Sequence, residues 1–100
     1  MSDLPDLPDL RLATDQSRVD FLQTDLELCF TFADLAKTER GIGDLDAAHR
    51  LLEKAELGYV TMAGILPAVE SAGQKIEIQE KLTELRGRLD REQQCLNGLK

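Results

Sequence analysis

Apolar residues recur at alternating spacings of three and four along most of this chain, and no other feature restricts its fold as strongly. The first series is Val19, Leu22, Leu26, Cys29, Ala33 and Ala36. The second series is Leu45, Ala48, Leu52, Ala55, Tyr59, Met62 and Leu66. The third series is Ile78, Leu82, Leu85, Leu89 and Leu96, with Glu92 in the remaining seam position. This spacing puts each series on one face of an α-helix, so the sequence predicts three amphipathic helices.

The first predicted helix has a wider apolar surface than the other two. A second stripe lies beside the first and consists of Phe21, Leu28, Phe32 and Leu35. We therefore expect this helix to touch two neighbours. Asp15 or Ser17 can cap its start, and Gly41 and Gly43 end it after about Arg40.

The second predicted helix begins after Asp44, a good capping residue, and Pro67 leaves two possibilities for its end. Proline removes one backbone hydrogen bond and disfavours helical geometry at the preceding residue. The helix therefore either stops near Leu66 or continues with a kink to Ala72. Gly73 then breaks the chain before the third helix.

Each helical segment spans about 23 residues, or about 35 Å, and the third runs from about residue 74 to 96. Short connections require consecutive helices to run antiparallel. The sequence thus predicts an all-α fold, an antiparallel up-down-up three-helix bundle, as a single domain over residues 15–100. Residues 1–14 repeat the unit DLP, and their prolines and aspartates predict a flexible acidic tail, with a leucine-bearing partner motif as the alternative.

The charge balance argues against several classes of partner. Twelve basic and nineteen acidic side chains give a net charge of −7, whereas nucleic acids and anionic membranes select basic surfaces. The longest apolar run, from Leu57 to Leu66, is too short for a membrane span. The acidic start lacks the pattern of a secretory signal, and Cys29 and Cys95 have no partner at metal-ligand spacing. We therefore expect a cytoplasmic protein with reduced thiols.

No constellation of residues in the sequence specifies a reaction. His49 is the only histidine, and a nucleophile pair of Cys29 and His49 would lack an orienting third group. The carboxylates have basic neighbours at helix-pair spacing, as in Glu77–Lys81 and Glu84–Arg88, which is typical of a solvated face. The glycines form no phosphate-binding pattern. We expect no catalytic residue, no metal and no cofactor, and hence a protein that is not an enzyme.

The stretch from Phe32 to Ala55 resembles one tetratricopeptide repeat, a helical hairpin that stacks into peptide-binding solenoids. The residues that carry the resemblance are Phe32, Leu35, Ala36, Gly43, Ala48, Leu52 and Ala55. Glu39 and Val60 depart from the pattern, and no second repeat follows. The resemblance implies two closely packed helices with a peptide-binding inner face. The chain is also similar, more weakly, to the three-helix microtubule-interacting and trafficking domain.

The leading functional hypothesis is a small protein–protein interaction module. Phe30, Ala33, Lys37 and Arg40 form a strip on one face of the first helix, and Phe30 lies outside both apolar stripes. Such a strip predicts a site for a partner helix or peptide. Lys37 and Arg40 have an alternative role at the negative end of the helix dipole. The alternative function is a structural homodimer, which the regular heptads of the third helix favour.

Overall fold

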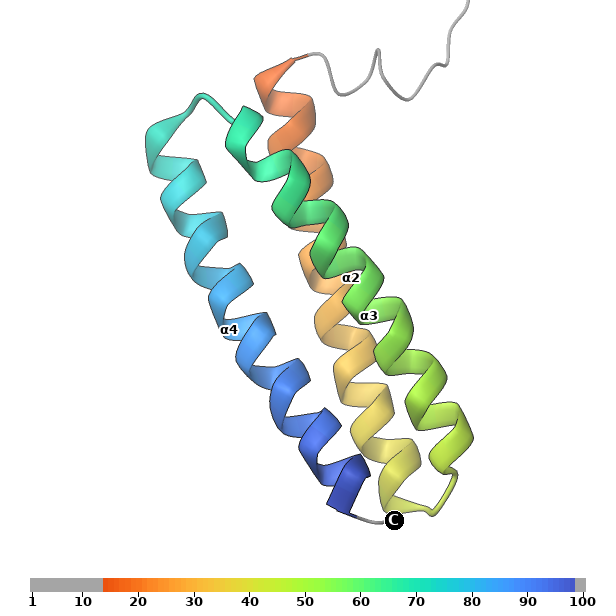
Figure 1. Cartoon of the computed structure of the whole chain (residues 1–100). Helices are drawn as coiled ribbons and strands as arrows, with labels where there is room; N and C mark the ends of the chain where they lie inside the picture. The colour runs from red at the N-terminus through yellow and green to blue at the C-terminus, as the bar shows by residue number, and fades with distance from the viewer. Residues whose placement is uncertain (1–13, 99–100) are drawn as a thin grey trace, which may run out of the picture.

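Three long helices form an antiparallel up-down-up bundle in the computed structural model, which describes residues 14–98 (Figure 1). The helices are α2 (Asp15–Gly41), α3 (Leu45–Ile65) and α4 (Ala72–Gly98), with a short 3-10 turn, η1 (Leu66–Ala68), after α3. Residues 14–98 contain no strand. The all-α three-helix prediction is therefore confirmed, whereas residues 1–13 of the predicted tail lie outside the described residues.

The start of α2 differs from the prediction because Asp15 has another role. Thr14 is the N-cap, and its hydroxyl accepts a hydrogen bond from the Ser17 backbone N–H at 3.0 Å. The Asp15 carboxylate instead accepts hydrogen bonds from the backbone N–H groups of Glu70 at 2.6 Å and Ser71 at 3.0 Å. Asp15 thereby ties the connection before α4 to the first turn of α2.

The turn between α2 and α3 follows the prediction. Gly41 is the last residue of α2, and Gly43 adopts a φ of 89°, a conformation that glycine tolerates without steric cost. The Asp44 carboxylate accepts a hydrogen bond from the Ala47 backbone N–H at 3.1 Å and so caps α3. This short turn makes α2 and α3 an antiparallel hairpin.

Of the two ends that the sequence allowed for the second helix, the structure has the stop near Leu66. The α-helix ends at Ile65, Pro67 lies in η1, and the chain becomes extended at Val69 with a ψ of 129°. Val69 is buried, so the connection is anchored in the core at this point. The prediction that Gly73 breaks the chain is wrong, because Gly73 lies in the first turn of α4.

The core contains every residue of the three predicted series except Leu45 and Tyr59, which are half-buried and pack against it. The second stripe of α2 is less covered. Leu28 and Leu35 are 46% and 44% exposed, although α2 does contact both α3 and α4. These two leucines remain accessible because α4 packs on a different side of the hairpin.

α2 packs more extensively on α3 than either helix packs on α4. Small side chains line this contact, namely Ala33, Ala36, Ala48 and Ala55, all fully buried. Gly58 of α3 lies against the buried Cys29 side chain of α2, and a Cβ atom at position 58 would overlap the Cys29 Sγ atom. Small residues at these positions let the two helix backbones approach closely.

We expect Gly58→Ala to lower the free energy of unfolding by about 1–3 kcal/mol, because the added methyl group overlaps Cys29 in a packed core. Gly64→Ala is the matched control in the same helix, since a Cβ there meets no atom within 4 Å. The control substitution should stabilise the protein by up to about 1 kcal/mol through helix propensity. Urea denaturation measures both values, and equal effects at the two positions would contradict the proposed close contact.

Candidate functional site

The four residues predicted to bind a partner do not form one open strip. Ala33 is fully buried in the core, so its assignment as a contact residue was wrong. Phe30 is half-buried, Lys37 is exposed and Arg40 is half-buried. The reason is geometric, because Ala33 belongs to the core-facing series of α2 and lies one turn after Phe30 and one turn before Lys37. Phe30 and Lys37 remain accessible, but the buried Ala33 between them leaves no continuous accessible strip.

Arg40 makes an ion pair that the sequence pattern did not predict. Its Nε atom donates a hydrogen bond at 3.2 Å to Glu92 of α4, the charged residue in the otherwise apolar third series. Glu92 is only 7% exposed, so its carboxylate lies against α2. The bundle contact extends beyond Glu92 along α4, because Leu96 is buried as well. A charge in a seam position does signal a partner on a neighbouring helix, because an unpaired buried charge is costly. The sequence alone could not say which helix supplies it.

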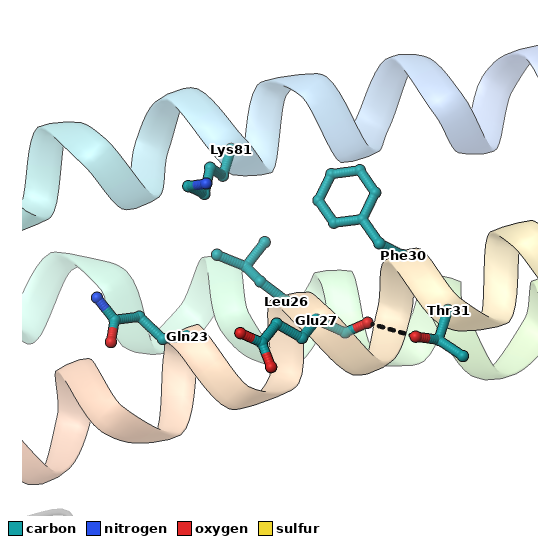
Figure 2. A pocket seen from close by; sticks show the side chains of 6 residues that line it. All are labelled: Gln23, Leu26, Glu27, Phe30, Thr31 and Lys81. Carbon is teal, nitrogen blue, oxygen red and sulfur yellow. Dashed lines mark hydrogen bonds between the residues drawn. The ribbon is translucent and has the colours of Figure 1, made fainter.

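A groove with a volume of about 510 Å³ lies between α2 and α4. Its lining residues are Gln23, Leu26, Glu27, Phe30, Thr31 and Lys81. In Figure 2 the Phe30 ring and the Leu26 side chain extend from α2 toward α4, and Lys81 lies across from them on α4. Glu27 and Gln23 lie along the α2 rim. The groove thus has an apolar floor between polar rims.

Ion pairs fix how α4 lies on the hairpin and so shape this groove. Arg88 binds Asp34 of α2 at 2.6 Å, and Arg86 binds both carboxylate oxygens of Glu56 of α3 at 2.8 and 2.6 Å. Arg86 also stacks over the Tyr59 ring at 4.9 Å. The hydrogen bonds to Glu56 raise the pKa of the Arg86 guanidinium further above its already high ordinary value.

Leu26 and Lys81 are groove residues that the sequence pattern did not reveal. Leu26 was predicted to be a core residue, and it is buried in the core as well as lining the groove. Lys81 was expected on a solvated face beside Glu77. Similarly, Arg88 binds Asp34 on another helix rather than Glu84 within α4. No local pattern in the sequence identifies these partners, because they depend on the axial position of α4 relative to α2.

Cys29 and His49 do not form a nucleophile pair. The Cys29 thiol donates a weak hydrogen bond to the Ala55 carbonyl oxygen at 3.7 Å. His49 is six residues from Ala55 along α3, a rise of about 9 Å. Burial, and then the charge of Asp25, raise the pKa of the Cys29 thiol to about 11, which disfavours the nucleophilic thiolate. Residues 14–98 also contain no group of three His, Cys, Asp or Glu side chains placed to hold a metal ion.

Comparisons with protein-family models, with curated proteins and with solved structures give no match to this chain. Within residues 14–98, no helix combines the length and apolar character that crossing a membrane requires.

We expect Arg40→Ala to lower the free energy of unfolding by about 1–3 kcal/mol, because the buried Glu92 carboxylate loses its charged partner. Lys37→Ala, one turn earlier and exposed, is the matched control and should change stability by less than about 0.5 kcal/mol. Adding Glu92→Leu to Arg40→Ala should recover the loss, since leucine completes the apolar seam. Equal effects of the two single substitutions in urea denaturation would show that Arg40 has no structural role.

The two thiols should differ strongly in reactivity toward a disulfide reagent at mildly alkaline pH. Cys95 is exposed and should react quickly, whereas the buried Cys29, with a raised pKa, should react only as the protein opens. Absorbance of the released thiolate counts the fast and slow thiols, and Cys95→Ser should remove the fast phase alone. A fast phase that survives in Cys95→Ser would contradict the burial of Cys29.

Proposed function

We propose that this chain is a small protein–protein interaction module that binds a partner helix or peptide in the α2–α4 groove. The observation that carries the proposal is the apolar floor of Leu26 and Phe30 inside a groove with polar rims. Binding sites of this kind take one apolar anchor and fix its orientation through a few polar contacts. The site thus uses Phe30, one of the predicted residues, with α2 supplying most of the lining.

The rims carry charges of opposite sign, Glu27 on α2 and Lys81 on α4 (Figure 2). A suitable partner segment therefore presents an apolar side chain to Phe30, with a basic group toward Glu27 and an acidic group toward Lys81. Charge pairs at an exposed rim add specificity and orientation more than affinity. The net charge of −7 does not favour a nucleic acid as the ligand.

The wider assignments belong to the same proposal. The close contact of small residues in the α2–α3 hairpin supports a tetratricopeptide-like relationship for Phe32 to Ala55. The free Cys29 and Cys95 thiols fit a reducing, cytoplasmic location. We favour a binding role over an enzymatic one because the groove combines an apolar floor with a few polar side chains on its rims.

The test is selection of binders from a display library that contains both helical and extended random peptides. We expect enriched peptides whose affinity falls by about 2 kcal/mol with Phe30→Glu, because this change puts a charge on the apolar floor. Fluorescence anisotropy with labelled peptides measures the affinity. Lys81→Glu should weaken those peptides that carry an acidic residue beside the anchor.

Ile76→Glu is the matched control, because Ile76 is a 61% exposed apolar residue of α4 outside the groove lining. It should leave peptide affinity unchanged, and circular dichroism should show wild-type helical content for every variant. The proposal fails if no peptide is enriched, or if the enriched peptides bind Phe30→Glu as tightly as the wild type.

A further inference from the structure

A second apolar surface lies on the hairpin, away from the α2–α4 groove. We call it the outer α2–α3 face; its residues are Leu28, Phe32, Leu35 and Glu39 of α2 and Ala47, Arg50, Leu51 and Lys54 of α3. Six of them line a shallow groove with a volume of about 330 Å³. Leu28 and Leu35 are each more than 40% exposed, so the face is an accessible apolar patch of the kind that marks an interaction surface.

α4 does not reach this face. The hairpin side chains that form ion pairs with α4 are Asp34 and Arg40 of α2 and Glu56 of α3, and none of them lines the outer groove. Asp34 follows Phe32 by two residues, a rotation of about 200° around a helix, so the two side chains point to nearly opposite sides of α2. Figure 1 likewise shows α4 on one side of the α2–α3 pair.

The charge on the outer α2–α3 face differs from that of the whole chain. The protein carries a net charge of −7, but this face has two basic residues, Arg50 and Lys54, and one acidic residue, Glu39. Two copies of an acidic protein repel each other when acidic surfaces meet. Two copies that meet at the outer face each present two basic residues and one acidic residue rather than an acidic surface.

The positions of these charges also suit a twofold axis. The Cys29–Ala55 hydrogen bond and the stacking of Lys54 on Phe32 set a register in which Leu35 lies opposite Leu51. Glu39 lies four residues beyond Leu35, about 6 Å along the bundle in one direction. Lys54 lies three residues beyond Leu51, about 4.5 Å in the other direction, because α3 runs antiparallel to α2.

We propose that two copies of this chain pair through the outer α2–α3 face in an antiparallel, isologous dimer. The twofold axis lies in the interface at the level of Leu35 and Leu51, perpendicular to the helices. It brings Lys54 of each copy to the level of Glu39 of the other, giving two equivalent ion pairs around an apolar centre. The two hairpins then form a four-helix core with one α4 on each outer side.

Sedimentation equilibrium over a wide concentration range tests the dimer. We expect the wild type to dimerise reversibly and Leu35→Asp to be a monomer with unchanged helical content. Leu57→Asp is the matched control, because Leu57 is 69% exposed on α3 but lies outside the face, and it should dimerise like the wild type. A wild type that stays monomeric at every concentration overturns the proposal and leaves the face to a different partner.

A charge exchange tests the twofold geometry separately. Glu39→Lys and Lys54→Glu should each raise the dissociation constant about tenfold, and the double variant should return it toward the wild-type value. Failure of the double variant to recover, or a dimer that survives Leu35→Asp, overturns the arrangement. Phe30→Glu leaves this face intact, so its effect on peptide binding and the effect of Leu35→Asp on dimerisation report on the two proposals independently.

Discussion

The close contact between α2 and α3 determines most of this structure. Alanines at the crossing and the absence of a side chain at Gly58 let the two backbones approach until Cys29 fills the remaining space. Large apolar side chains have no room at the centre of such a contact, so they lie along its two sides. Leu26 and Phe30 lie on one side, and Phe32 and Leu35 lie on the other. The close approach of the α2 and α3 backbones therefore leaves the hairpin with an apolar edge on each side.

α4 covers one of these edges and leaves the other accessible. Its buried leucine seam packs on the hairpin, and polar contacts add to this packing, since arginine side chains of α4 bind carboxylates on both α2 and α3 and Glu92 binds Arg40. Asp15 holds the connection that begins α4. These contacts place α4 beside α2 with a groove between them. The groove and the outer face thus have one origin, a third helix that packs less extensively than the first two pack on each other.

The two surfaces differ in their chemistry. The α2–α4 groove has an apolar floor of Leu26 and Phe30 and rims that carry charges of opposite sign. On the outer face, the leucines are flanked by the basic Arg50 and Lys54 and the acidic Glu39. A dimer through the outer face would leave both α2–α4 grooves open, so the chain would present two equivalent binding sites. Both surfaces include residues of α2, whose apolar side is wider than those of the other two helices.

The sequence by itself determined the helices and the core. Apolar spacing alone identifies the buried residues of α2, and Gly43 and Asp44 fix the hairpin turn, because periodicity and capping are local properties of the chain. Only the tertiary structure decided which polar residues are engaged. Spacing put Ala33 in both the core series and the strip for a partner, and the structure has it in the core. The contact of Arg40 with Glu92 depends on the rotation of α2 and on the position of α4, which spacing does not give. The relative orientation and axial position of two helices depend on side-chain packing over their whole interface, and no single segment of sequence contains that information.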